Sequence, residues 1–120
     1  MSGAVGVIGL GIMGGAMARH LVNGGFTVHG FDLSADAMEN ARADGVEILA
    51  SAAAVAETAA VIVCSLPSPS ALYVVAEEIA VSPAVGCVMV ETSTLKIADK
   101  EVARDILAAA GHTLLDCPLS

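Results

Sequence analysis

The stretch Gly9-Leu10-Gly11-Ile12-Met13-Gly14 has the spacing G-x-G-x-x-G and lies between two segments of different periodicity. Before it, residues 4–8 form a short apolar run typical of a buried strand, and after it residues 15–22 have the apolar spacing of a helix. Asp32 follows eighteen residues after the last glycine. A strand, a glycine turn, a helix and an acidic residue in this order predict a binding site for a dinucleotide.

Each glycine of this turn has a separate expected role. Gly9 lets the chain turn sharply, Gly11 lets the backbone approach a pyrophosphate because it has no Cβ, and Gly14 lets the helix pack close to the strand. The pyrophosphate then lies at the helix N-terminus, where free N–H groups point at it. A tight glycine turn without a ligand is the alternative, and the flanking strand, helix and acid disfavour it.

The composition indicates one α/β unit. The chain has 120 residues, the size of one domain or of a piece of one, so we treat residues 1–120 as a single dinucleotide-binding domain. Its hydrophobic fraction of 56% comes mostly from alanine and valine, and aromatic residues make up 2%. Small aliphatic residues in short runs are typical of parallel strands that Ala-rich helices cover.

The acidic balance and the cysteines exclude several classes of partner. A net charge of −8 argues against a nucleic-acid partner, which would require a basic face. No segment has the length of a membrane span and the N-terminus lacks a secretion-signal pattern, so we expect no membrane partner and a cytoplasmic location. Cys64, Cys87 and Cys117 are odd in number and lack metal-ligand spacing, so we expect buried, reduced thiols and no metal site.

Strand and helix patterns alternate along the whole chain. Ser34 and Ser51 are expected N-caps, and Ser70 is expected to open a helix. The alternation predicts an α/β fold with a Rossmann-type, doubly wound parallel sheet and right-handed crossovers. The expected strands cover residues 4–9, 27–31, 46–48, 60–65, 87–91 and 112–116, and the expected helices cover residues 12–24, 35–44, 52–57, 70–80 and 95–110.

The residues just after each strand are the candidates for a binding site, because ligands of such sheets bind at the carboxyl ends of the strands. These residues are the glycine turn, Asp32, Leu66-Pro67-Ser68, Thr92-Ser93-Thr94 and the segment from Asp116 to Ser120. All of them are expected to lie along one edge of the sheet.

Asp32 decides between the two nicotinamide cofactors. Its carboxylate can accept hydrogen bonds from the adenosine ribose hydroxyls, and it would repel the 2′-phosphate of NADP. At ~4 Å and an effective dielectric constant of ~20, that repulsion is on the order of 4 kcal/mol per unit charge before screening. The next residues, Leu33 and Ser34, supply no positive charge. We therefore expect NAD rather than NADP, with a helix-capping or solvated role for Asp32 as the alternative.

Four segments resemble the β-hydroxyacid dehydrogenase family, and together they span the whole chain. The family includes 3-hydroxyisobutyrate dehydrogenase and, more distantly, 6-phosphogluconate dehydrogenase. The final segment resembles the start of the family's substrate loop, D-A-P-V-S-G-G. The segments are residues 7–14 with Met17-Ala18 and Leu21, the loop Ser65-Leu66-Pro67-Ser68, the stretch Glu91-Thr92-Ser93-Thr94, and Leu115-Asp116-Cys117-Pro118-Leu119-Ser120.

Several positions depart from the family pattern. Glu91 and Thr92 replace the usual Asp and Ser, and His20 stands where Asn is frequent. Cys117 and Leu119 replace the common Ala and Val. These changes keep size or polarity similar, so the fold assignment stands and the identity of the substrate stays open.

The resemblance implies an NAD-dependent oxidoreductase that passes hydride between a small 3-hydroxy acid, such as 3-hydroxyisobutyrate, and NAD. In the family, an all-helical C-terminal domain supplies the catalytic lysine. That domain is absent from this chain, so we expect no catalytic residue here, and we expect the full-length enzyme to be a homo-oligomer. The implied cofactor contacts are Gly9, Leu10, Gly11, Ile12, Met13, Gly14, Asp32, Leu33, Leu66, Pro67 and Thr94, and the implied substrate contact is Ser120.

The remaining ionisable residues are expected to be structural. Lys96 and Lys100 are the only lysines, and both are interpreted as solvated charges on the last helix. His29 and His112 fall at strand positions and are expected to be packed or partly exposed imidazoles rather than catalytic bases. Asp116 is expected to orient the substrate loop.

Two other functions remain open from the residues alone. An NADP-linked semialdehyde or imine reductase is one, and the pair Asp32-Leu33 disfavours it. A non-catalytic NAD-binding module is the other. A domain of this family docks against a helical partner, so we expect part of its surface to be apolar and the isolated chain to self-associate.

Overall fold

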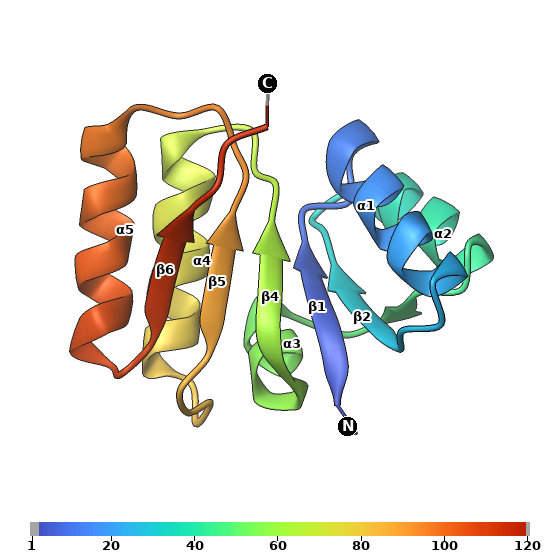
Figure 1. Cartoon of the computed structure of the whole chain (residues 1–120), viewed down its shortest axis with the longest axis horizontal. Helices are drawn as coiled ribbons and strands as arrows, with labels where there is room; N and C mark the ends of the chain where they lie inside the picture. The colour runs from blue at the N-terminus through green and yellow to red at the C-terminus, as the bar shows by residue number, and fades with distance from the viewer. Residues whose placement is uncertain (1–2, 120) are drawn as a thin grey trace.

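The computed structural model describes residues 3–119, and its centre is a six-stranded parallel sheet (Figure 1). The strand order is β3-β2-β1-β4-β5-β6, so the chain starts in the middle of the sheet and winds outward first to one edge and then to the other. This is the doubly wound topology that the alternation predicts. The strands are β1 (Ala4–Ile8), β2 (Val28–Phe31), β3 (Glu47–Ile48), β4 (Ala59–Cys64), β5 (Val88–Glu91) and β6 (Thr113–Asp116).

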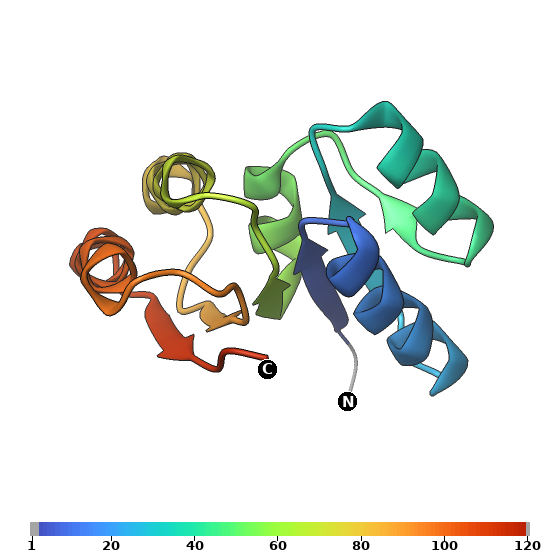
Figure 2. The same cartoon turned by 90° about the horizontal axis from the view of Figure 1, so that it is seen from above.

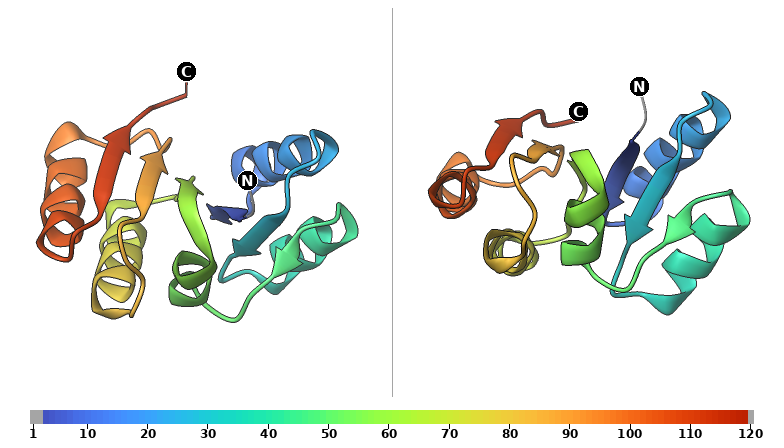
Figure 3. Two further views of the ribbon diagram at one scale, coloured as in Figure 1. Left: turned by 60° about the horizontal axis from the view of Figure 1, so that its bottom comes forward. Right: turned by 90° about the horizontal axis from the view of Figure 1, so that it is seen from below.

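Five helices connect the strands and cover the two faces of the sheet. Figures 2 and 3 show α1 and α2 on one face and α3, α4 and α5 on the other. No helix of the described chain is both long enough and apolar enough to cross a membrane. The helices are α1 (Ile12–Asn23), α2 (Ala35–Ala43), α3 (Ala52–Thr58), α4 (Pro69–Val81) and α5 (Ile97–Ala109).

Serine side chains cap the N-termini of three of these helices, α2, α3 and α4. Ser34 and Ser51 accept hydrogen bonds from the N–H groups of Ala37 and Ala54, which confirms both expected N-caps. The expected start of α4 at Ser70 is wrong by one residue. The helix begins at Pro69, because proline is pre-organised for the first helical position and the preceding Ser68 is the cap.

Two apolar cores lie on opposite faces of the sheet. The larger one joins β4 and β5 to α3, α4 and α5, with Ile62, Leu72 and Met89 fully buried in it. The smaller one lies under α1 and α2 and contains Val7 and Val28. Both cores meet β1, which brings the glycine turn after β1 to the centre of the sheet edge.

One half of one sheet face has no helix over it. In Figure 1, β4, β5 and β6 are open toward the viewer, while α1 covers only the neighbouring half. Val61 and Leu115 of this open face are 43% and 46% exposed, and Val61 pairs with Val88 in the sheet. The expected apolar surface is therefore present, and self-association of the chain stays a prediction.

The cysteines divide into two environments. Cys64 and Cys87 are buried, and burial raises the pKa of both thiols. Cys117 is exposed, so the expectation of buried thiols is wrong for this residue. It lies beyond the last strand, where no helix covers the chain.

We expect Cys117 to react alone in the native protein. A thiol reagent such as dithiobis-nitrobenzoate attacks only thiolates that it can reach, so the folded chain should release one equivalent of chromophore within minutes. After unfolding in guanidinium, the yield should rise to all three thiols. Cys117→Ser should remove the fast native reaction. Two or more fast equivalents from the native wild-type chain would contradict this assignment.

Candidate cofactor-binding site

A cleft of about 730 Å³ opens at the carboxyl ends of β1, β2 and β4. Of the residues predicted to bind the cofactor, Gly9, Gly11, Ile12, Met13, Asp32, Leu33, Leu66 and Pro67 line it. These residues come from three separate loops, so the fold brings the predicted site together at the place where the strand order reverses.

Three predicted site residues lie elsewhere. The side chain of Leu10 is buried in the smaller core, although its backbone belongs to the glycine turn. Gly14 is buried in α1, and Thr94 is exposed after β5. A cofactor contact from Thr94 stays a prediction. Ser120 lies outside the described residues.

The three glycines of the turn differ in what a side chain would meet. Packing within the protein excludes a side chain at Gly9 and Gly14, but not at Gly11. Gly9 has φ +94°, and a Cβ there would lie 1.9 Å from the carbonyl oxygen of Ser65. A Cβ on Gly14 would lie 1.8 Å from the carbonyl oxygen of Gly9. A Cβ on Gly11 would meet nothing within 4 Å, and Gly11 has an ordinary φ of −67°. A side chain at Gly11 would therefore collide with no protein atom, and Gly11 lines the cleft.

The N-terminus of α1 is free of side-chain caps. Gly11 is the N-cap residue, no side chain hydrogen-bonds to this end, and no acidic residue lies in the first turn. The first N–H groups of the helix therefore keep their hydrogen-bonding capacity, and the helix dipole adds partial positive charge. A pyrophosphate fits this end chemically, because it supplies the negative charge and the acceptors that the helix lacks.

Asp32 joins the glycine turn to the start of α2. Its Oδ2 accepts a hydrogen bond from the N–H of Leu10 at 2.6 Å, and its Oδ1 accepts one from the N–H of Ser34 at 2.8 Å. A carboxylate has about four acceptor positions, so two remain for ribose hydroxyls. Ser34, not Asp32, caps α2 with its side chain. Asp32 is therefore held in place from two sides while it lines the cleft.

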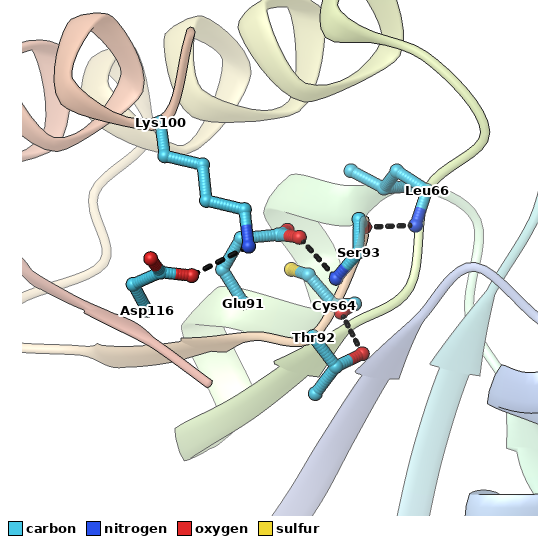
Figure 4. Close-up of polar contacts among 7 residues, drawn as sticks. All are labelled: Cys64, Leu66, Glu91, Thr92, Ser93, Lys100 and Asp116. Atoms are coloured by element: carbon cyan, nitrogen blue, oxygen red, sulfur yellow. Dashed lines mark hydrogen bonds and ion pairs between the residues drawn. The ribbon is translucent and has the colours of Figure 1, made fainter. Parts of the chain in front are cut away.

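The expectation that Lys100 is a solvated charge is wrong. It is 4% exposed, and its Nζ lies 2.5 Å from Oδ1 of Asp116 (Figure 4). Lys100, Ala103 and Leu107 form the buried stripe of α5, so the lysine stem lies along the apolar face and its amine reaches the strand end. Lys100 precedes Ala103 by three residues and Leu107 by seven, which is the spacing of one helix face. That spacing could have indicated that Lys100 is buried. Lys96 is exposed, as expected.

Sequence reasoning also missed the buried carboxyl of Glu91 at the end of β5. It is 0% exposed, and its Oε1 accepts a hydrogen bond from the N–H of Ser93 at 2.6 Å. Burial raises the pKa of Glu91, while the hydrogen bond from Ser93 and the charge of Lys100 act in the opposite direction and Asp116 raises it further. Glu91, Lys100 and Asp116 thus form one charge cluster behind the loops of the cleft.

His29 is partly exposed and His112 is buried, as the sequence led us to expect. His112 is buried, and its Nδ1 accepts a hydrogen bond from the N–H of Cys87. His29 lies between Thr58 and Glu47, at 2.7 Å from Oγ1 and 2.9 Å from Oε2. Neither histidine lines the cleft.

A family model described as the NAD-binding domain of 6-phosphogluconate dehydrogenase matches residues 4–120. The chain belongs to this family. The α/β dinucleotide-binding fold, NAD as the cofactor class and the resemblance to β-hydroxyacid dehydrogenases are thereby confirmed for the NAD-binding domain.

Curated relatives of this NAD-binding domain are dehydrogenases of hydroxy acids. A protein of Dictyostelium discoideum named "Probable 3-hydroxyisobutyrate dehydrogenase, mitochondrial" is 36% identical over 99% of the chain. The human mitochondrial 3-hydroxyisobutyrate dehydrogenase is 34% identical over 97% of it. The chain spans 38% and 35% of the lengths of these two proteins.

Solved structures show the same fold. The 3-hydroxyisobutyrate dehydrogenase of Mycobacterium tuberculosis, solved with L-serine, superposes with a TM-score of 0.94 at 28% identity, over 100% of this chain and 41% of that one. An imine reductase of Streptomyces aurantiacus superposes with a TM-score of 0.81 at 27% identity, over 92% of this chain and 39% of that one. The same domain fold therefore occurs in a 3-hydroxyisobutyrate dehydrogenase and in an imine reductase.

Proposed function

We propose that this NAD-binding domain is the cofactor half of a dehydrogenase that oxidises a small 3-hydroxy acid, such as 3-hydroxyisobutyrate, with NAD. The observation that carries the proposal is Gly11. Gly11 lines the cleft at the uncapped N-terminus of α1, and a Cβ there would meet no protein atom, so packing within the protein does not explain the glycine. The named relatives support the hydroxy-acid part of the proposal.

Different residues of the cleft bind different parts of the cofactor. The backbone at Gly11 and the first turn of α1 bind the pyrophosphate, and Asp32 binds the adenosine ribose. Leu33, Leu66 and Pro67 supply apolar contact along the walls. When bound, NAD supplies the hydride acceptor, and the protein orients it.

The substrate contacts and the oligomeric state of the full-length enzyme are part of the same proposal. Thr94 and Ser120 are expected near the nicotinamide and the substrate, because they follow the neighbouring strands β5 and β6. The lysine that moves the proton is expected on the all-helical domain that the family resemblance implies, and the full-length enzyme is expected to be a homo-oligomer. A cytoplasmic location stays a prediction, since two of the relatives are named mitochondrial.

A reductase that uses NADP is the second candidate. An imine reductase among the structural neighbours favours it. Asp32 opposes it, because the carboxylate lines the cleft where a 2′-phosphate would lie and would repel that group.

A paired titration with NADH and NADPH tests the proposal. We expect saturable enhancement of NADH fluorescence, and NADPH binding weaker by about tenfold or more because a screened charge repulsion of about 1.4 kcal/mol suffices for that factor. No saturable binding of NADH would overturn the proposed cofactor role. Equal or tighter binding of NADPH would replace the NAD-linked function with the NADP-linked one.

A further inference from the structure

Two buried side chains of the loop after β5 hold the loop after β4. The N–H of Leu66 donates a hydrogen bond to Oγ of Ser93 at 2.7 Å, and Oγ1 of Thr92 donates one to the carbonyl oxygen of Cys64 at 2.7 Å (Figure 4). Thr92 and Ser93 are 7% and 5% exposed. Leu66 lines the cofactor cleft, whereas Ser93 is buried and does not line it, so Ser93 is connected to the cleft through its hydrogen bond to Leu66.

Glu91 in turn holds Ser93. Its Oε1 accepts the N–H of Ser93, so the two ends of Ser93 make hydrogen bonds on opposite sides, one toward the carboxyl and one toward the cleft loop. A carboxyl this deeply buried carries a large desolvation penalty. Lys100, paired with Asp116, supplies the nearest positive charge and lowers that penalty.

The loop after β4 supports the glycine turn directly. A Cβ on Gly9 would lie 1.9 Å from the carbonyl oxygen of Ser65, so the backbones of the two loops are in close contact. A shift of Ser65 and Leu66 therefore changes both one wall of the cleft and the base of the pyrophosphate turn.

We propose that Ser93, oriented by Glu91, is a positioning residue for cofactor binding. It keeps the Leu66 loop in the conformation that lines the cleft before the cofactor arrives, so that binding requires no reordering of this loop. This inference rests on the proposed function of the cleft, and adds a residue that touches no cofactor atom.

The test compares two serines that make the same kind of hydrogen bond. Ser93→Ala removes the acceptor for the N–H of Leu66, and Ser51→Ala removes the acceptor for the N–H of Ala54, at the start of α3. Both variants are expected to melt at a lower temperature than wild type. At a temperature where both are folded, Ser93→Ala should bind NADH about tenfold more weakly, because the Leu66 N–H loses its partner, and Ser51→Ala should bind like wild type. Ser93→Thr keeps the hydroxyl and should restore binding.

Amide hydrogen exchange gives a second measurement that does not need the cofactor. The N–H of Leu66 should exchange faster in Ser93→Ala and also in Glu91→Leu, but not in Ser51→Ala. Adding Glu91→Leu to Ser93→Ala should weaken NADH binding no further, because Glu91 acts through Ser93. If Glu91→Leu does not fold, Ser93→Ala and Ser93→Thr still decide the matter.

The outcomes separate the two proposals. Wild-type chain that does not bind NADH overturns the proposed function and this inference with it. Wild-type chain that binds NADH while folded Ser93→Ala binds it equally well overturns only the positioning role, as does equal weakening by Ser51→Ala.

Discussion

Gly11→Ala is expected to weaken NADH binding by about 100-fold while leaving the fold intact. Gly11 lines the cleft at the end of α1, and the new methyl group would meet no protein atom, so we expect it to keep the pyrophosphate from the backbone N–H groups. Losing two charge-assisted hydrogen bonds of about 1.5 kcal/mol each corresponds to roughly that factor. Calorimetric titration with NADH measures the loss, and urea unfolding should show a change in stability below about 1 kcal/mol.

Gly14→Ala is the matched control for this prediction. It adds the same methyl group three residues further on, where it would lie 1.8 Å from the carbonyl oxygen of Gly9. Overpacking of backbone against backbone should lower the free energy of unfolding by about 3 kcal/mol. Gly11→Ala protein that binds NADH as wild type does would identify the turn as a structural feature without a ligand.

Asp32→Ala is expected to weaken NADH binding by about 30-fold and NADPH binding by less than about threefold. The carboxylate contributes hydrogen bonds to the ribose of NADH, each worth about 1 kcal/mol or more, but it repels the 2′-phosphate of NADPH, so its removal has opposing effects on the second cofactor. Paired fluorescence titrations measure the ratio of the two dissociation constants, which should fall toward one.

The same substitution also acts on the folded chain. The N–H groups of Leu10 and Ser34 lose their acceptor in Asp32→Ala, which should lower the stability by about 1–3 kcal/mol. Titrations therefore belong at a temperature where the variant is folded. Asp36→Ala removes an equal charge from an exposed position of α2 and should change neither affinity. Equal weakening of NADH and NADPH by Asp32→Ala would remove its role in cofactor choice.

The glycine turn, the doubly wound parallel sheet and the position of Asp32 could be predicted from the chain alone. Gly9, Gly11 and Gly14 and the apolar runs on either side are local signals, since they act over a few residues. The strand–helix alternation predicts a doubly wound parallel sheet with right-handed crossovers, and the structure then gives the order of its strands. The first residue of a helix could not be predicted as well as its presence. Pro69 begins α4 one residue before the expected start, because Ser68 and Ser70 both satisfy the pattern of a helix opening.

Burial of charge could not be predicted in the same way. Lys100 looks like a solvated residue when only its charge is considered, and its partner Asp116 lies sixteen residues further along the chain on another element. Glu91 is fully buried at the end of β5, where it pairs in the sheet with Cys64 of β4 on one side and Asp116 of β6 on the other. The charge of Lys100, which acts on Glu91, comes from another element of the chain, and no local pattern reports that proximity.

The amino-acid sequence by itself determined which residues form the turn, which strands surround it and which acid follows, because these depend on short-range periodicity and on the steric properties of glycine. Only the tertiary structure decided that a side chain at Gly11 would meet no protein atom, whereas one at Gly9 or Gly14 would collide with the backbone. It also decided that Ser93 holds Leu66 across 27 residues of chain. Contacts between distant loops depend on the packing of whole elements against one another, and that packing exists only in the folded chain.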